Sequence, residues 1–486
     1  MPIANTLFKI CVTLLVFFGF LPDAFPVFCE VEIEKHEASL EECLEQALQN
    51  NRRRPASRYA VEIAEAQHRQ VLAGYWPQIS LKLGYQRLDD DPNYIFPSYN
   101  IEIPIGGTIP IDIPGVGIVP VDRITIPEQD IKLMDKETYR ASLGGSWLIY
   151  DGGMRKGYRE QTAGVLEMMK QEARRTDLEV IDSVNRLYYG AVMAIQLHQV
   201  GRDTLARMEA TLGLTETMYK EGSGRVKKTD WLDNTVMVES MRSMVAQLEK
   251  NEVMAQAALA NTMGLPWNVS VKPTEREIPF TPLSDGLEKL VGDAYRFNPD
   301  WGKIEAGLRA AEGSLLTAGS ASSPKVAITG ELYKWWNDYD AGINTARNKE
   351  GWSIGIGVEI PVFDGSLNRN KVAEARARVA KIKEEQLLLK DGLGLQLKDI
   401  FLSLNAVEKS HQATLDAMNA ARENRILNTR AYRHELVEFE KVIRAQLVEA
   451  FMSAQHYRTR YENVALKSRL DLLVGAEVRK KTGENE

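Results

Sequence analysis

The 486-residue sequence predicts an α+β fold in which long antiparallel coiled-coil helical hairpins join four β-strands of membrane-spanning length, arranged as two internal repeats. Three patterns predict this fold. Blocks of similar sequence recur at fixed spacings, four segments alternate apolar and polar residues, and the long segments after them carry apolar residues every three or four positions. A period of two is typical of strands with unlike faces, and a period near 3.5 is typical of coiled coils.

The overall composition is that of an ordinary folded protein. Hydrophobic residues make up 44% and charged residues 26% of the chain, and the formal net charge is −7. A surface that binds phosphates needs clustered Lys and Arg, and the one dense basic run, 52–54, is short. The composition therefore argues against nucleic acid as a partner.

The N-terminus, residues 1–29, resembles a secretory signal peptide. Lys9 precedes an apolar run that is too short to cross a bilayer as a helix. Cleavage after Ala24 and cleavage after Cys29 are both compatible with the sequence. Lipidation of Cys29 is an alternative, but the residues before it lack the pattern of a lipoprotein signal. We therefore expect an exported chain whose mature part begins at about residue 30.

We expect no helical membrane anchor in the mature chain, and whether a disulfide can form depends on the cleavage site. If cleavage follows Cys29, Cys43 is the only cysteine left, so no disulfide can form within the chain. No segment after residue 30 has 18 uncharged apolar residues, and we expect no transmembrane helix.

Internal repetition organises the rest of the chain. Segment 39–77 resembles segment 286–324 at a spacing of 247 positions, and segment 148–153 resembles 361–366 at a spacing of 213. The matched pairs include Ala47 and Ala294, Asn51 and Asn298, Ala64 and Ala311, Pro77 and Pro324, and Tyr219 and Tyr432. We place repeat one at about 38–265, repeat two at about 285–475, and a polar C-terminal tail at 476–486. Each repeat is expected to begin with a helix.

Four segments alternate with period two and are expected to be strands: 79–86, 139–149, 325–332 and 352–360. Each has one apolar face and one face of small or polar residues. Their lengths match those of tilted transmembrane β-strands. Four half-buried strands of a soluble sheet are the alternative that alternation alone leaves open.

An insertion, residues 88–137, separates the first two strands. It holds seven of the nineteen prolines within isoleucine-rich sequence, and proline cannot donate to a β-ladder, so a central strand is excluded here. Long loops of outer-membrane barrels lie outside the cell. We expect either an extended extracellular hairpin that partly covers the outer end of the barrel, or a mobile surface loop.

The segments after the strands are expected to be very long helices. Apolar residues step by three and four along them, as in Ile181, Val184, Tyr188, Ala191 and Ile195, and again in Leu393, Leu397, Ile400, Leu404 and Val407. About 67 residues separate Gly153 from Tyr219, which is roughly 100 Å of helix. A purely structural coiled coil would show the same pattern, but its direct junction with membrane-length strands argues against that interpretation.

Four strands are too few to close a barrel. In lipid, each unpaired backbone group on an open sheet edge costs several kcal/mol. Other copies of the chain must therefore complete the edges, and the sequence predicts an oligomer.

Several motifs at this point resemble the TolC-type outer-membrane efflux protein family, also called outer-membrane factors, over about residues 38–475. Segment 73–81 is similar to the family's helix-to-strand motif, and segment 361–365 to its strand-to-helix turn. Tyr219, Gly222 and segment 230–233 resemble its helix-hairpin tip. At the two strand-to-helix turns, the aspartate suits a helix cap and the glycine a sharp bend, and we expect these roles for Asp151, Gly152, Asp364 and Gly365.

The resemblance implies a homotrimer in the outer membrane of a Gram-negative bacterium. Four strands per protomer would close one transmembrane β-barrel, and the helices would continue it as a long periplasmic α-barrel. It also implies an exit duct of a tripartite efflux or type I secretion system, which receives small molecules or proteins from a periplasmic adaptor and an inner-membrane pump. An exported structural or adhesive coiled-coil protein without transport activity is the alternative.

The hairpin tips are expected to form the periplasmic gate. Relatives usually have acids at two positions of the second tip, where this sequence has Lys441 and Arg444. We expect Arg444 to pair with Asp230 or Asp233 of an adjacent hairpin, as a latch that the adaptor releases. Whether the gate is anionic or cationic stays open, and a solvated helix face is the alternative. The candidate gate residues are Asp230, Asp233, Glu435, Glu438, Glu440, Lys441 and Arg444.

No motif in the sequence indicates catalysis. The six histidines are scattered without metal-site spacing, no phosphate-binding loop ends in Gly-Lys-Ser or Gly-Lys-Thr, and no Gly-x-Ser-x-Gly elbow occurs. We therefore expect no enzyme activity, no metal site and no cofactor.

Overall fold

The computed structural model describes residues 34–102, 108–121, 123–222, 224, 226–339 and 347–476. The expected signal peptide with Cys29, and all of the expected tail beyond residue 476, lie outside the described residues. Among the described residues, no helix combines the length and the apolar character needed to cross a membrane.

The chain forms two compact units. The tip unit comprises residues 34–52, 177–287 and 397–473, and the sheet unit comprises 53–176, 288–396 and 474–476. Two helices, α4 (Met154–Lys220) and α8 (Leu367–Arg433), contribute to both units. Each has 67 residues, so the predicted length and its repetition are confirmed.

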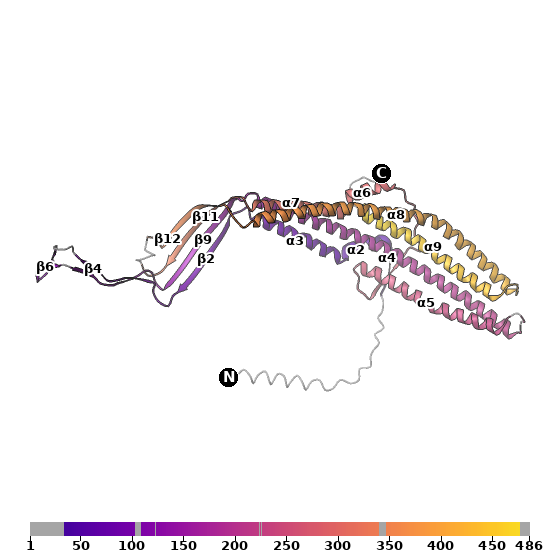
Figure 1. Cartoon of the computed structure of the whole chain (residues 1–486). Coiled ribbons are helices and arrows are strands. Elements are labelled where there is room, and N and C mark those ends of the chain that lie inside the picture. The colour runs from indigo at the N-terminus through magenta and orange to yellow at the C-terminus, as the bar shows by residue number, and fades with distance from the viewer. Residues whose placement is uncertain are drawn as a thin grey trace, which may run out of the picture. The chain divides into compact units, whose positions relative to one another are not determined.

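The sheet unit is built on a four-stranded antiparallel sheet (Figure 1). The strands are β2 (Gln78–Arg87), β9 (Glu137–Tyr150), β11 (Lys325–Trp336) and β12 (Glu350–Glu359), in the order β12-β11-β9-β2. All four predicted strands are therefore confirmed. The insertion in repeat one separates β2 from β9 in sequence, yet they are neighbours in the sheet.

The register of the sheet sorts its residues into two unlike faces. One rung joins Leu81, Leu143, Leu332 and Trp352, and the rung two residues away joins Ile79, Gly145, Gly330 and Ile354. Because opposed residues of antiparallel strands share a face, these rungs form one apolar face. The other face carries small and polar residues, among them Ser80, Lys82, Gly84, Arg140, Ser142, Gly144, Thr329, Glu331, Ser353, Gly355 and Gly357.

One irregularity interrupts this register. Val326 opposes Tyr150 and Ala327 opposes Leu148, so Ile149 has no Cα partner on β11. The extra residue is a β-bulge, which increases the local twist where a strand ends. It lies directly before the turn into α4.

The proline-rich insertion forms an extended hairpin of three two-stranded ladders, drawn beyond the sheet in Figure 1. The hairpin form of the prediction is therefore confirmed, whereas exposure outside the cell stays a prediction. The ladders pair β3 (Asn93–Phe96) with β8 (Gln129–Lys132), β4 (Tyr99–Glu102) with β7 (Arg123–Ile126), and β5 (Ile109–Ile113) with β6 (Gly117–Val121).

Each repeat begins with two helices where one was expected. In repeat two, α6 (Leu287–Phe297) ends before Asn298, whose side chain caps α7 (Pro299–Ser320) by accepting from the amides of Asp300 and Trp301. In repeat one, α2 (Leu40–Asn50) ends before Asn51 and α3 (Arg53–Ala73) follows. The repeated asparagine thus marks a break between helices.

The core of the tip unit lies where α2 packs on the middle of α4 and the end of α5 (Lys228–Thr262). Val184, Tyr188 and Leu259 are fully buried there. A parallel strand pair, β1 (Glu34–Ala38) with β10 (Val269–Pro273), covers this core. Residue alternation does not predict this pair, because five-residue strands with distant partners show little of it.

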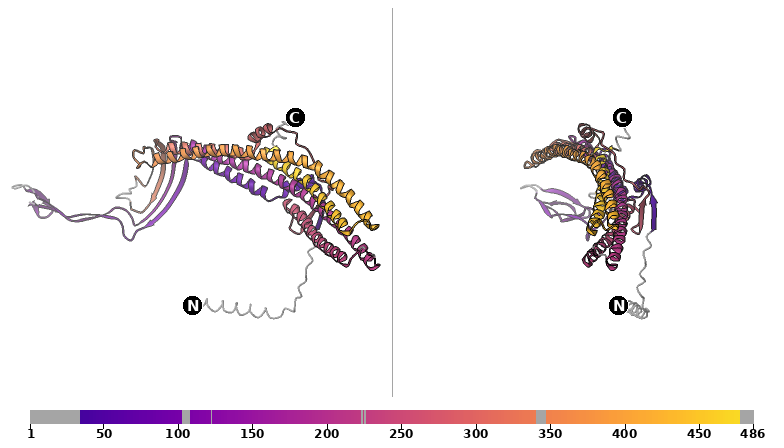
Figure 2. Two further views of the ribbon diagram at one scale, coloured as in Figure 1. Left: turned by 45° about the vertical axis from the view of Figure 1, so that its right-hand side comes forward. Right: turned by 90° about the vertical axis from the view of Figure 1, so that its right-hand side faces the viewer.

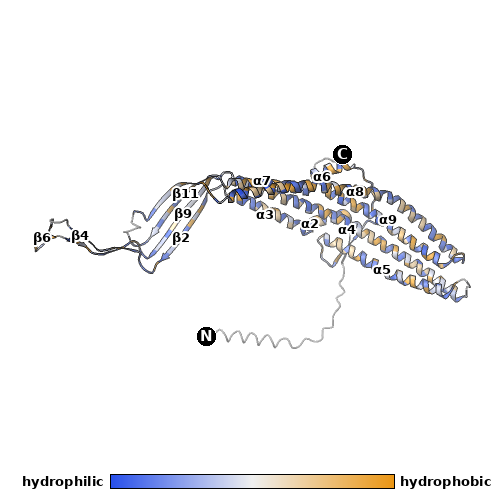
Figure 3. Ribbon diagram, viewed as in Figure 1, coloured by the Kyte–Doolittle hydropathy of each residue, from blue (hydrophilic) through white to orange (hydrophobic). Residues whose placement is uncertain are grey.

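The long helices form two antiparallel hairpins, α4–α5 and α8–α9 (Phe439–Val474), which lie side by side in the tip unit in both views of Figure 2. Leu397, Ile400 and Leu404 are at most 2% exposed, so their predicted place in a coiled-coil seam is confirmed. Orange and blue residues alternate along the helices in Figure 3, as expected for helices with unlike faces.

A glycine follows the last helix of each repeat, α5 in repeat one and α9 in repeat two. Gly264 has φ +80°, and a Cβ there would lie 2.5 Å from the carbonyl oxygen of Asn50 in the tip unit. Gly475 has φ +69°, and a Cβ there would lie 2.5 Å from the carbonyl oxygen of Phe297 in the sheet unit. Since Asn50 and Phe297 are matched positions of the two repeats, the same close contact is built twice.

Candidate functional site

The two strand-to-helix turns are the first set of predicted site residues. At the first turn, the carboxylate of Asp151 accepts hydrogen bonds from the Gly153 amide at 3.0 Å, the Arg155 amide at 2.9 Å and the Arg155 Nε at 2.7 Å. Burial by itself would raise the pKa of this carboxyl, but the Arg155 and Gly153 hydrogen bonds outweigh it and hold the pKa below its ordinary value. Asp151 is therefore the predicted cap of the following helix.

The second turn repeats this geometry with fewer contacts. Asp364 accepts from the amide of Asn368 at 3.0 Å, and Asn368 stands where the first repeat has Arg155. Gly152 and Gly365 both have φ +65°, a left-handed conformation that glycine adopts at little cost, at matched points of the two turns. Asp151 is buried whereas Asp364 is exposed, so the two turns differ in their surroundings.

The helix-hairpin tips are the second set, and all lie in the tip unit. The first tip joins α4 to α5, and the second joins α8 to α9. In the first tip, Gly222 has φ +79°; in the second, the matched residue is Glu435, with φ +53°. The second tip therefore keeps the left-handed turn without the glycine, and the glutamate bears the steric cost of that conformation.

A buried polar network fixes the two tips to each other. The hydroxyl groups of Thr215 and Tyr432 lie 2.8 Å apart, and Asn234 Nδ2 donates to Thr215 Oγ1 at 3.2 Å. Farther from the tip, Gln446 Nε2 donates to Thr211 Oγ1 at 3.0 Å. The pattern of apolar residues does not predict this network. Its signal in the sequence is threonine at positions 204, 211 and 215 of α4.

An ion pair continues this polar seam away from the tip. Glu449 of α9 accepts from Arg425 Nε at 2.7 Å and from Arg425 Nη2 at 3.2 Å, and Arg207 Nη2 lies 3.6 Å from the same carboxylate. A two-point contact between arginine and a carboxylate fixes orientation as well as distance. The α4, α8 and α9 helices are thus also joined by charge.

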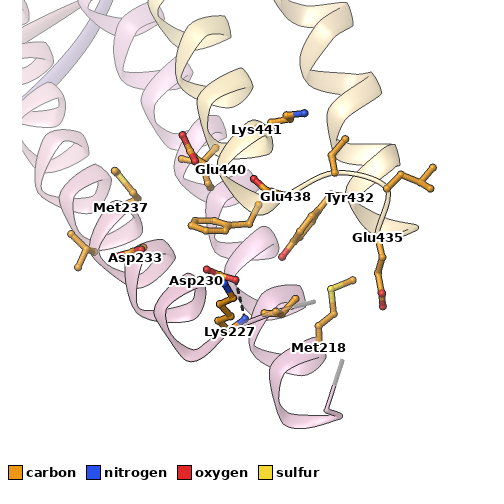
Figure 4. Close-up of a pocket in the computed structure, with 16 residues that line it drawn as sticks. Met218, Lys227, Asp230, Asp233, Met237, Tyr432, Glu435, Glu438, Glu440 and Lys441 are labelled. Atoms are coloured by element: carbon orange, nitrogen blue, oxygen red, sulfur yellow. Dashed lines mark hydrogen bonds between the residues drawn. The ribbon is translucent and has the colours of Figure 1, made fainter. Parts of the chain in front are cut away.

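Between the tips lies an open cavity of about 950 Å³ (Figure 4). Seven charged residues line it, namely Lys227, Asp230, Asp233, Glu435, Glu438, Glu440 and Lys441. Five are carboxylates and two are amines, so the lining is acidic by three charges per protomer. The lining of this cavity is therefore acidic within one chain, and the sign of the assembled gate stays a prediction.

The cavity gathers six of the seven predicted gate residues. Asp230 accepts from the Lys227 amide at 2.9 Å and so caps α5, whereas Asp233 points toward the cavity in Figure 4. Lys441 extends away from α5 in the same view. Lys441 therefore adds a positive charge at the rim of the cavity but does not bridge Asp230 and Asp233.

Arg444 is the gate candidate that does not line this cavity. Its guanidinium pairs with Glu440 one turn earlier on α9, at 2.7 Å, and both side chains are well exposed. It borders a smaller groove of about 400 Å³ beside Met237 and Phe451. Within one chain the arginine is thus held by its own helix, and the expected pairing with another hairpin stays a prediction.

The chemistry available at the tips is electrostatic. Among the described residues, no group of three or more His, Cys, Asp or Glu is arranged to hold a metal ion. The cavity joins acidic side chains to apolar ones such as Met218, Val236 and Leu436. Such a lining attracts cations and offers apolar contacts to a docking helix.

A model of a known protein family matches most of this chain. The family model described as "Outer membrane efflux protein" matches residues 43–265 and 290–473, which cover both repeats. The first of these segments ends near Gly264, and the second begins within α6 and ends near Gly475.

Individual proteins have low sequence identity to this chain, but solved structures superpose on nearly all of it. Protein CyaE of Bordetella pertussis is 26% identical over 275 residues, which cover 56% of this chain and 56% of that protein. A crystal structure of a membrane protein from Pseudomonas aeruginosa superposes with a TM-score of 0.73 at 17% identity, covering 94% of this chain and 99% of that one. A structure of CusC gives a TM-score of 0.70 at 16% identity, covering 94% and 98%. The chain spans about half to three-fifths of the length of the curated relatives that it matches.

Proposed function

The chain belongs to the outer membrane efflux protein family, and from this premise we propose that it forms a homotrimeric exit duct in the outer membrane of a Gram-negative bacterium. The duct passes substrates to the exterior from a periplasmic adaptor and an inner-membrane pump. The helical hairpins extend into the periplasm, where their tips meet the adaptor.

The observation that carries this proposal is the open four-stranded sheet. Within the described part of the chain, β2 and β12 each have a strand on one side only. One face of the sheet is apolar along 10 to 14 residues per strand, which suits the hydrocarbon layer. Lipid does not tolerate unpaired strand edges, so β2 of one copy pairs with β12 of the next. Three copies supply twelve strands and close a barrel.

Aromatic residues at both ends of the apolar face support a membrane position. Tyr85 and Tyr139 contact each other with ring centroids 4.9 Å apart at the end that carries the hairpin, and Trp336 shares their rung. Near the other end, Trp147 donates its indole N–H to the Tyr75 carbonyl at 3.0 Å. Aromatic girdles at the two interfaces are typical of outer-membrane barrels.

The tips are proposed as the gate. Three acidic cavities around one axis hold nine net negative charges, three from each protomer. Such a ring concentrates cations and disfavours anions at the entrance. The exposed Arg444–Glu440 pair contributes only about 0–1 kcal/mol, so Arg444 can exchange Glu440 for an acid of the neighbouring protomer at little cost.

The experiment is conductance of the purified trimer in planar lipid bilayers. We expect stepwise, ohmic channels with a preference for cations. Changing Asp233, Glu435 and Glu438 together to their amides should lower that preference, because nine charges leave the ring. Glu41→Gln on α2, an exposed carboxylate far along the chain from the tips, is the matched control and should leave selectivity unchanged.

Two results would count against the proposal. A protein that never inserts or conducts is not a duct and would favour a structural coiled coil. A conducting protein whose ion selectivity is the same with and without the three carboxylates would retain the duct but reject the tips as its charged gate.

A further inference from the structure

The proline-rich hairpin between β2 and β9 is anchored to the sheet as a continuation of it. The Leu88 amide donates to the Lys136 carbonyl at 2.9 Å, and the Leu133 amide donates to the Pro92 carbonyl at 2.7 Å. Lys132 lies 2.8 Å from Asp91 and 2.7 Å from Asp135, so an ion-pair bridge fixes the base. The hairpin therefore leaves the end of the sheet in a defined direction.

Each outer ladder of the hairpin has one apolar face. In the β4–β7 ladder, Tyr99 opposes Ile126 and Ile101 opposes Ile124. In the β5–β6 ladder, Ile109 opposes Val121 and Ile111 opposes Val119. We call these eight residues the ribbon face: Tyr99, Ile101, Ile109, Ile111, Val119, Val121, Ile124 and Ile126.

The opposite face of the same ladders is polar or proline-rich. Thr125 donates to Asn100 at 2.8 Å, and Arg123 lies 3.5 Å from Glu102. These polar groups satisfy one another within the hairpin. The two faces therefore differ in character: polar groups of the opposite face pair within the hairpin, although Ile118 is exposed there, whereas the ribbon face is apolar throughout.

The ribbon face is too exposed for a ladder that stands alone. Tyr99 is 53% exposed, Ile109 47% and Ile101 44%. An isolated two-stranded hairpin is only marginally stable in water, and a third strand or a packed apolar face is needed for a persistent structure. Exposed apolar side chains on one face of each ladder indicate a binding surface.

The edges of the hairpin favour a partner that packs on the face. Pro110 and Pro120 oppose each other on one rung. Because proline has no N–H, such a rung fits a ladder only where the nitrogens point outward, toward the free edges. Both edges therefore lose a donor at this rung, which hinders the addition of another strand and leaves face packing as the available contact.

Charge argues against a lipid surface as that partner. Residues 88–136 contain nine Asp or Glu and three Lys or Arg, so the hairpin is acidic. Acidic segments are repelled by anionic membrane surfaces. The ribbon face itself carries no charge, so it suits an equally apolar surface.

The partner that is always present is the same hairpin from the other copies. The hairpin continues from β2, the edge strand that in the proposed trimer pairs with a neighbouring copy. Each trimer therefore brings three ribbon faces to the same end of the barrel. We propose that these three faces pack against one another to form a three-ribbon stalk at the channel exit. This inference rests on the proposed trimer.

Disulfide trapping tests the stalk with two adjacent residues. Ile111 lies on the ribbon face, and Asp112 is the next residue on the opposite face. Purified detergent-solubilised trimers of Ile111→Cys and Asp112→Cys are oxidised under identical mild conditions, with the protein lacking either change as the background. We expect Ile111→Cys to form covalent dimers at least about tenfold faster than Asp112→Cys.

The mass of the protein–detergent particle is measured first, so that the two proposals fail separately. A particle that is not trimeric refutes the proposed trimer and, with it, the stalk. Trimers in which both cysteines cross-link equally, or in which neither does, refute the stalk alone. If Ile111→Cys resists cross-linking but loses thiol reactivity when phosphatidylglycerol vesicles are added, a membrane occupies the ribbon face and the stalk is also refuted.

A second pair of variants covers the case in which cysteine disturbs the hairpin. Placing aspartate at both Ile111 and Val119 should open the stalk, because desolvated carboxylates would face one another, and should increase cleavage of the hairpin by proteinase K severalfold. Asp112→Ser should leave the cleavage rate unchanged. Equal cleavage of both variants in intact trimers would overturn the stalk.

Discussion

A charge on the apolar face of the sheet should block assembly, whereas the same charge one residue away should not. Ile354 and Ser353 are neighbours on β12, both exposed in the single chain, and their side chains lie on opposite faces. Ile354 shares a rung with Ile79, Gly145 and Gly330 near the middle of the sheet. Ile354→Arg therefore places a cation in the hydrocarbon layer, and Ser353→Arg places it in the water-filled interior.

The size of the effect follows from this position. Arginine on the lipid face at the bilayer midplane costs about 2–4 kcal/mol, and in the lumen it costs close to nothing. A trimer carries the change three times, so Ile354→Arg should disfavour assembly by about 6–12 kcal/mol relative to Ser353→Arg. A loss of this size is comparable to the whole free energy of unfolding of an ordinary folded domain, which is about 5–15 kcal/mol.

Outer-membrane fractions should be assayed by gel electrophoresis with and without heating, so that assembled trimer and monomer separate. We expect Ser353→Arg to yield trimer at close to the unmodified level and Ile354→Arg to yield little or none. Equal trimer levels for the two variants would refute the assignment of faces. Loss of trimer in both would instead indicate that the interior is packed rather than open to water.

Three further outcomes follow from single contacts. Gly264→Ala should destabilise the fold by about 2–4 kcal/mol in thermal unfolding, because a Cβ at φ +80° lies 2.5 Å from a backbone oxygen; an unchanged melting temperature would contradict this. Arg444→Glu should raise the resting conductance of bilayer channels, and restoring the cross-protomer pair with Asp233→Arg should partly reverse it; unchanged conductance would exclude the latch. The pKa of Asp151 is lowered from 3.8, so its carboxylate stabilises the fold at neutral pH and loses that contribution as the pH falls below about 4. Asp151→Asn should therefore reduce stability at pH 7 more than at pH 3, and more than Asp364→Asn does; equal losses at both values of pH would show that the ion pair is unimportant.

Local periodicity was enough to predict the strands and the long helices. Alternation along 79–86 and 352–360 reflects two faces with different surroundings, and such a pattern is written residue by residue. The turn residues Asp151 and Asp364 were predictable for a similar reason, because capping and bending act over three or four neighbours.

Repetition extended this local information. Gly222 and Glu435 are 213 positions apart, which is the spacing of the repeat. Both have positive φ, so they occupy matched points of the two tips. The second tip has glutamate where the first has glycine, yet it keeps the left-handed backbone conformation there. Packing of the paired helices outweighs a steric cost of about 1–2 kcal/mol at one residue.

Tertiary structure alone decided the features that join distant segments. The β1–β10 pair, the hydrogen bond between Thr215 and Tyr432 and the ion pair of Arg425 with Glu449 each depend on the register between elements far apart in sequence. The acidic sign of the tip cavity also required the structure. In sequence the second tip has prominent cations, but Arg444 pairs along its own helix while the carboxylates of both tips collect around one cavity. A residue's charge is local information, whereas the charges that surround it are set by the helices that pack against its own.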